Sequence, residues 1–149
     1  MRSRPVSLKS KAIGLLARRE YSRSELEHKL TARGAERGQV RPLLDELIAE
    51  GYLSDARYAR ALAAQKQGGY SRRRIAEALK SKGVERIDID AALEAVEVDD
   101  GAALRALWQR RFGRMPMDER DKARQVRFLQ SRGFSLSAIL KLLREAATD

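Results

Sequence analysis

One short pattern recurs three times along the chain at a nearly constant interval. It is a leucine followed four residues later by a glycine, each time near the end of a basic segment. The leucines are 49 and then 50 residues apart, and the pattern stands at Leu30/Gly34, Leu79/Gly83 and Leu129/Gly133. Self-similarity at a fixed period of this size indicates a repeat array, in which units too small to fold alone stack on their neighbours.

Each repeat has the sequence features of three helices. Ser22 with Glu25 three residues later predicts a capping box, and Gly34 suits the left-handed residue that ends a helix. Apolar residues also recur nine, ten and thirteen positions after each glycine, so the third helices align as well, with Ile48 and Ile87 among their apolar residues. No strand pattern is seen. We therefore predict an all-α fold, an elongated and curved array of three tandem three-helix repeats at 7–51, 52–98 and 99–147, preceded by a basic tail at 1–6.

The third repeat departs from the other two in its middle helix, which we expect at 118–132. Ala123, Val126 and Leu129 are the side chains expected to face inward. Gln125 stands where the first two repeats have leucine and isoleucine. A polar residue at a core position predicts that this helix packs differently.

The residues needed for catalysis or metal binding are sparse. The chain has no cysteine and one histidine, His28, which is expected to be a helix residue without a catalytic or ligand partner. Acidic pairs at Asp88/Asp90 and Asp99/Asp100 stand where helices begin, and carboxylates there satisfy free amides. No glycine-rich phosphate loop is present. We expect no enzyme activity, no cofactor and no metal.

The sequence offers no membrane segment and no secretory signal. No apolar run approaches the roughly 20 residues that span a bilayer, and the basic N-terminus lacks a hydrophobic core segment. We therefore expect a cytoplasmic protein with no membrane partner.

The charge balance favours a polyanionic partner. Lys and Arg number 31 against 21 Asp and Glu, a net charge of +10. Residues 1–50 carry +4, residues 51–100 are neutral and residues 101–149 carry +6. The alternative is a soluble protein that merely has a basic pI.

The densest basic run lies in the otherwise neutral second repeat. Arg72, Arg73 and Arg74 open its middle helix, where cations oppose the helix dipole. Such a conflict points to a functional site, since an anion bound at that end would relieve it; alternatively, the arginines extend into water or pair with nearby glutamates. The full set of candidate DNA- or partner-binding residues is Arg18, Arg19, Lys29, Arg33, Arg72, Arg73, Arg74, Lys80, Lys82, Lys122, Arg124, Arg127 and Arg132.

The aromatic residues permit two interpretations. Tyr52, Tyr58 and Tyr70 could stack on bases, but beside apolar residues at helical spacing they favour packing in the core or between units. Trp108 and Phe112, four residues apart, are expected in the core.

Three segments together resemble the RecX family of bacterial recombination regulators. They are RREYSRSEL at 18–26, GYLSDARYA at 51–59 and RFLQSRGFS at 127–135, and the likeness covers about residues 8–145. One departure is Gly68-Gly69-Tyr70, where many relatives have Gly-Tyr-Gly. The resemblance implies tandem three-helix repeats and a non-enzymatic modulator, usually an inhibitor, of the RecA recombinase. It also implies binding in the groove of the RecA–single-stranded DNA filament, which reduces ATPase, strand exchange and co-protease activity.

A physical mechanism follows from the array. Units linked in one chain raise each other's effective concentration on a partner that spans several subunits. Phosphate contacts would bind single-stranded DNA, and duplex DNA more weakly, without sequence choice. We expect a monomer. The alternative is a stand-alone nucleic-acid-binding protein, because three-helix units overlap in shape with helix-turn-helix readers.

Overall fold

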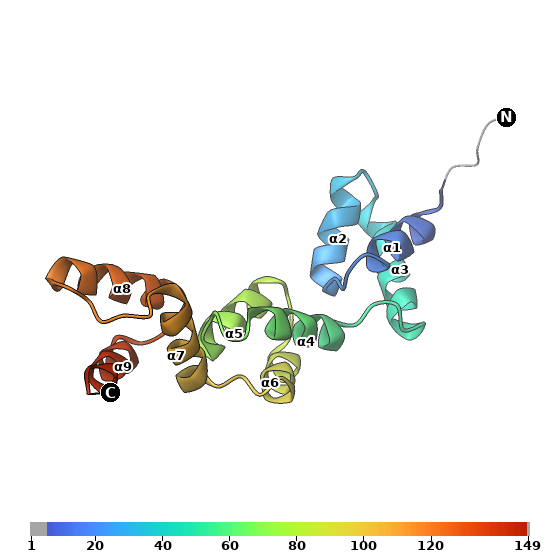
Figure 1. Ribbon diagram of the computed structural model, residues 1–149. Coiled ribbons are helices and arrows are strands. Elements are labelled where there is room, and N and C mark those ends of the chain that lie inside the picture. Colours follow the sequence, from blue (N-terminus) through green and yellow to red (C-terminus); the bar gives the residue numbers. More distant parts are fainter. Residues whose placement is uncertain (1–5, 149) are drawn as a thin grey trace.

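The computed structural model describes residues 6–148, and within them the chain forms nine helices and no strand (Figure 1). The predicted basic tail lies outside the described residues except for Val6. The all-α fold of tandem three-helix repeats is confirmed. The helices are α1 (Leu8–Leu16), α2 (Arg23–Ala32), α3 (Arg37–Ala49), α4 (Asp55–Lys66), α5 (Arg72–Ser81), α6 (Arg86–Ala95), α7 (Asp100–Arg111), α8 (Glu119–Ser131) and α9 (Leu136–Ala147).

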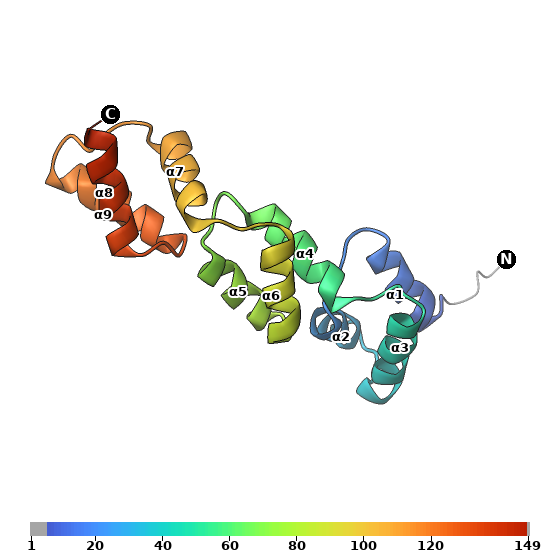
Figure 2. The same ribbon diagram turned by 90° about the horizontal axis from the view of Figure 1, so that it is seen from below.

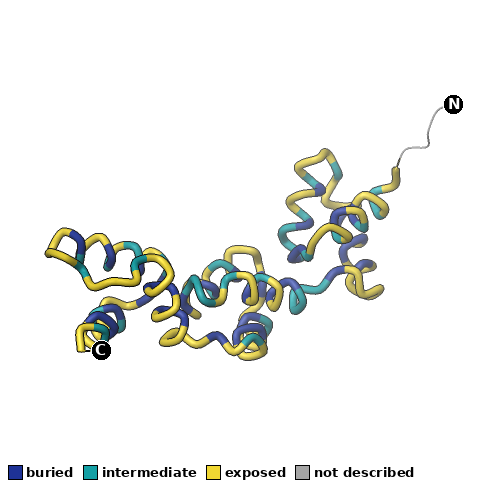
Figure 3. Tube along the Cα trace, viewed as in Figure 1, coloured by how far each residue is buried: buried dark blue, intermediate teal, exposed yellow. Residues whose placement is uncertain are grey.

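The helices form three successive groups along an elongated molecule. In two perpendicular views α1–α3, α4–α6 and α7–α9 follow one another from end to end (Figures 1 and 2). Each group has its own buried apolar cluster, and exposed residues occur in all three groups (Figure 3). The segment entering each next group completes the preceding core, since Leu53 belongs to the first cluster and Val98 to the second.

The middle helices of the three groups meet end to end. The backbone amide of Ser71 at the start of α5 donates to the carbonyl of Arg132 after α8, at 3.0 Å. Likewise the Ser22 hydroxyl at the start of α2 donates to the carbonyl of Lys82 after α5, at 2.7 Å. The negative end of one helix dipole therefore faces the positive end of the next. The end of α5 lies so close to the start of α2 that only a glycine fits after α5: a Cβ on Gly83 would lie 2.7 Å from Ser24 Cβ.

The predicted helix ends are largely present. Ser22 and Glu25 form the capping box, in which the Glu25 amide donates to the serine oxygen and the carboxylate accepts from the serine amide. Gly34 ends its helix at a φ of 97°. Serine or aspartate side chains also accept amides at the starts of α1, α4, α5, α7, α8 and α9.

Several apolar residues expected in the cores lie on the surface. Ile48, next to the buried Leu47, is 44% exposed, and Ile87 is 73% exposed. Successive residues on a helix point about 100° apart, so Ile48 lies beside the buried stripe that Leu44 and Leu47 form in α3. Ile87, in the first turn of α6, likewise lies off the face formed by Ile89, Ala92 and Leu93. Tyr52 is also exposed, whereas Tyr58 is buried.

The middle helix of the third repeat does pack differently, but not as expected in detail. Its inward residues are Asp121, Gln125 and Leu129, four positions apart, so Ala123 is exposed rather than inward. Buried Gln125 accepts a hydrogen bond from Trp108 Nε1 at 2.9 Å and donates to the Arg114 carbonyl at 3.3 Å. Each polar atom thus has a partner, which a buried amide requires. Trp108 is in the core, as predicted.

Candidate functional site

The start of α5, where the three arginines stand, is closed by protein groups. Besides the Ser71 amide, which is bound to α8, the Arg72 amide donates to Asp100 Oδ1 at 2.7 Å and the Arg74 amide donates to Ser71 Oγ at 3.1 Å. The Arg72 side chain also donates to the Val98 carbonyl at 3.1 Å, beyond the end of α6. The polar groups of the chain therefore relieve the helix-end conflict without a bound anion.

The next two arginines share one carboxylate. Arg73 Nη1 lies 2.7 Å from Glu77 Oε1, and Arg74 Nη1 lies 3.6 Å from Glu77 Oε2. Arg73 also donates to the carbonyl of Gly133 at 3.3 Å, across the contact with α8. Both side chains remain at least half exposed, and exposed ion pairs of this kind are worth at most about 1 kcal/mol. Their charge is therefore still available to an external anion.

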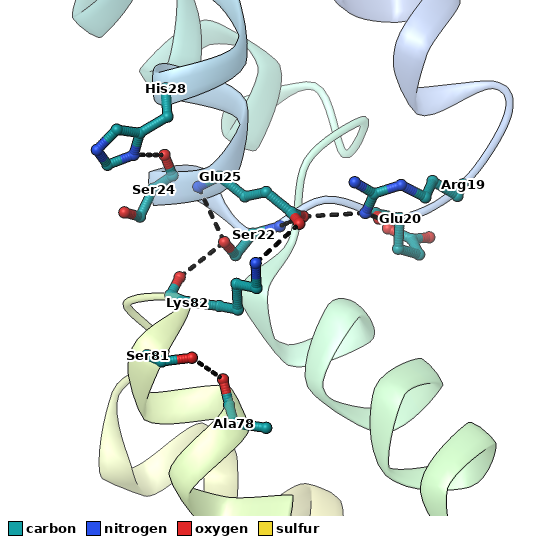
Figure 4. Close-up of polar contacts among 9 residues, drawn as sticks. All are labelled: Arg19, Glu20, Ser22, Ser24, Glu25, His28, Ala78, Ser81 and Lys82. Carbon is teal, nitrogen blue, oxygen red and sulfur yellow. Dashed lines mark hydrogen bonds and ion pairs between the residues drawn. The ribbon is translucent and has the colours of Figure 1, made fainter.

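The contact between the first and second repeats is neutralised by Glu25 (Figure 4). Its carboxylate lies 3.0 Å from Arg19 Nη1 and 3.8 Å from Lys82 Nζ, so it joins two of the predicted basic residues. The hydrogen bond to Glu25 raises the pKa of the Arg19 guanidinium. These groups line a cleft of about 510 Å³ that also includes Tyr58, whose pKa is raised chiefly by burial.

His28 lies near this contact but takes no part in it. It is exposed, and its Nδ1 lies 2.7 Å from the Ser24 carbonyl one turn earlier in α2 (Figure 4). Within residues 6–148 no group of three or more potential metal-ligating side chains converges.

The contact between the second and third repeats holds cations stacked on aromatic rings. Arg132 lies 4.6 Å from the ring centre of Tyr70 and 5.0 Å from that of Phe128. Lys66 lies 4.6 Å from the Tyr70 ring, and Arg111 lies 4.7 Å from the Phe128 ring. These distances fall within the range of cation–π attraction. We call Lys66, Tyr70, Arg111, Phe128 and Arg132 the junction cluster.

The other predicted basic residues are spread over the helices. Arg124 lies 2.9 Å from Asp121 and is also 5.6 Å from the Phe112 ring centre. Lys122 is half-buried near the start of α8. The remaining candidates are all exposed: Arg18, Lys29, Arg33, Lys80 and Arg127.

Two charged residues of these contacts were missed from the sequence. Lys66 was not a candidate, although its spacing of four residues before Tyr70 could have suggested a pair. Asp121 was also missed: it accepts from the Met117 amide, Arg124 and Arg114, which together hold its pKa below the usual range. The spacing to Arg124 is local, but the other two partners, Met117 and Arg114, come from the preceding loop, and no helix pattern indicates them.

No helix in the described part of the chain combines the length and apolar character needed to cross a membrane.

Models of three protein-family domains match the chain in order. They are the first, second and third three-helix domains of RecX, which match residues 9–47, 54–93 and 98–143. Curated relatives called regulatory protein RecX include those of Pseudomonas entomophila (strain L48), 46% identical over 93% of this chain and 91% of the relative, and Pseudomonas fluorescens (strain Pf-5), 42% identical over 97% and 94%.

Two solved structures share the fold. The crystal structure of RecX from Lactobacillus salivarius aligns with a TM-score of 0.66 at 19% identity, over 95% of each chain. A crystal structure of a regulatory protein RecX aligns with a TM-score of 0.70 at 21% identity, over 97% of this chain and 82% of the other.

Proposed function

The chain belongs to the RecX family of regulatory proteins, and from this premise we propose that it binds the RecA–single-stranded DNA filament. It acts mainly as an inhibitor, lowering recombinase ATPase, strand exchange and co-protease activity. It does so as a monomer in the cytoplasm and by binding alone, without catalysis.

The end-to-end arrangement of α2, α5 and α8 is the observation that supports this proposal most. The hydrogen bonds at both contacts join α8, α5 and α2 end to end along an elongated molecule, and α5 and α8 carry a net positive charge. A filament repeats its subunits along an axis, so a row of similar helices can engage several subunits or phosphates at once. Each linked contact then acts at a high effective concentration, and modest units combine into tight binding.

The proposed binding surface comprises the predicted basic residues, which are expected to contribute unequally to binding. Arg73 and Arg74 have exposed charge near the middle of the row, α8 adds Arg124 and Arg127, and Arg132 follows directly after α8. Arg72 has a mainly structural role, because its side chain binds carbonyls of α6 and the segment after it.

The test is inhibition of RecA ATPase on single-stranded DNA by the Arg73→Glu/Arg74→Glu variant. We expect weaker inhibition with unchanged helical circular dichroism, because the substitutions reverse two exposed charges and leave the Arg72 contacts intact. The matched control is Arg86→Glu/Lys141→Glu, which reverses two exposed charges on α6 and α9. Full inhibition by the first variant would refute the residue assignment.

Binding to three substrates at one salt concentration tests the function itself. The proposed regulator prefers the filament over naked single strand and naked duplex DNA. Tight binding to duplex with sequence preference would instead identify a stand-alone helix-turn-helix reader. A wild-type protein that leaves RecA activity unchanged would refute the proposal as a whole.

A further inference from the structure

Three cations of the junction cluster have no acidic partner among residues 6–148. Lys66, Arg111 and Arg132 form no ion pair with any described carboxylate, whereas Arg19, Lys82, Arg73 and Arg74 all do. The cluster therefore carries three positive charges that the rest of the described chain leaves uncompensated. Arg110, on the adjoining end of α7, is also exposed.

The aromatic rings hold these cations in fixed positions. Tyr70 contacts both Lys66 and Arg132, and Phe128 contacts both Arg132 and Arg111. Phe128 is itself held by an edge-to-face contact with Phe112, with ring centres 5.7 Å apart. A guanidinium already oriented on a ring loses less conformational freedom when it binds an anion, so pre-organised cations bind more tightly than free ones.

A comparison of the two inter-repeat contacts shows why only the second is cationic. Glu25 and Arg74 occupy the same register, 49 residues apart, in the middle helices of the first two repeats. At the first contact Glu25 joins Arg19 and Lys82. At the second contact an arginine stands in its place, and no carboxylate among residues 6–148 pairs with Arg132. One substitution within the repeat thus distinguishes a neutralised contact from a charged one.

We propose that the junction cluster binds the backbone and an unpaired base of single-stranded nucleic acid. This rests on the proposed function and extends it to Lys66, Arg111 and Phe128, outside the predicted set, and to Tyr70, which the sequence offered as a possible base-stacking residue. The cations meet phosphates, and a ring-bound guanidinium offers a flat outer face on which an unstacked base can lie. Duplex DNA keeps its bases stacked and an acidic protein surface has none, so neither uses the flat faces.

The test is fluorescence anisotropy of a labelled oligo-dT with the full-length protein and no recombinase, across a range of salt concentrations. The main variant is Lys66→Gln/Arg111→Gln, since neither side chain donates a hydrogen bond within the described chain. Loss of two phosphate contacts should reduce the magnitude of the slope of log affinity against log salt by about 1.4. At 0.1 M salt the affinity should then be weaker by on the order of 20-fold. The control Arg86→Gln/Lys141→Gln removes two charges elsewhere and should bind nearly as the wild type.

A second variant tests the rings separately from the charge. Phe128→Leu keeps every cation and an apolar side chain but removes the platform of Arg111 and Arg132. We expect several-fold weaker oligo-dT binding with a nearly unchanged salt slope, because the number of phosphate contacts stays the same. Circular dichroism confirms that the variant remains folded, and wild-type affinity in a folded variant would refute the role of the rings.

The outcomes separate this inference from the proposed function. Unchanged oligo-dT binding by Lys66→Gln/Arg111→Gln overturns the inference, whatever happens to RecA inhibition. An equal loss on duplex DNA and polyglutamate overturns the single-strand assignment in favour of a general polyanion site. If the variant loses oligo-dT binding while the wild type fails to inhibit RecA, the inference stands and the proposed function fails.

Discussion

Replacing Gly133 by alanine should uncouple the third repeat from the second, and Gly34 provides a matched control. Both glycines follow a middle helix with a φ of 97°. A Cβ on Gly34 would meet nothing within 4 Å among the described residues. A Cβ on Gly133 would lie 2.6 Å from Arg74 Cβ and would also overlap Ser71 Oγ.

The two variants share one energetic term and differ in another. An alanine in the left-handed region costs about 1–2 kcal/mol at either position. Only Gly133→Ala adds an overpacking cost, roughly 1–3 kcal/mol when the surrounding atoms must shift. At about 2–4 °C per kcal/mol for a chain of this size, this cost lowers the melting temperature by roughly 2–12 °C more than in Gly34→Ala.

Thermal unfolding by circular dichroism measures that difference. Hydrogen exchange of the Ser71 amide reports on the contact itself, since this amide donates to the Arg132 carbonyl. Exchange should become faster in Gly133→Ala and stay unchanged in Gly34→Ala. Equal melting temperatures together with unchanged Ser71 exchange would refute the close approach of α8 to α5.

Three further predictions concern buried or paired polar groups. Gln125→Leu should destabilise the chain by about 1–3 kcal/mol by leaving the Trp108 N–H unpaired, and urea unfolding followed by tryptophan fluorescence measures this. Asp121→Asn should lose the stability supplied by a carboxylate of lowered pKa. That stability exists above the ordinary pKa of 3.8 and disappears as pH falls through the lower pKa of the folded state. The melting temperatures of the wild type and the variant should therefore converge as pH falls below 3.8, and a difference that stays constant with pH would contradict this. Glu25→Arg should tighten oligo-dT binding by freeing its two cationic partners, more than Glu27→Arg, which changes the charge equally on the same helix.

The sequence alone determined the architecture, because the signals for it are local and repeated. Helix caps and stop glycines depend on residues within one turn, so Ser22, Glu25 and Gly34 could be interpreted correctly without tertiary contacts. The period of the Leu–Gly pattern then required a repeat array. The departure of Gln125 from that pattern correctly indicated different packing in the third repeat, although its partner Trp108 could not be identified.

Only the tertiary structure decided which charges are available. Arg72, Arg73 and Arg74 look equivalent in sequence, yet Arg72 binds carbonyls of α6 and of the segment after it, whereas Arg73 and Arg74 share Glu77. The partners that set these roles lie up to 63 residues away, as with Arg132 and the carbonyl of Gly69. Contacts at such separations depend on how the repeats stack end to end, and no local pattern in the chain encodes that geometry.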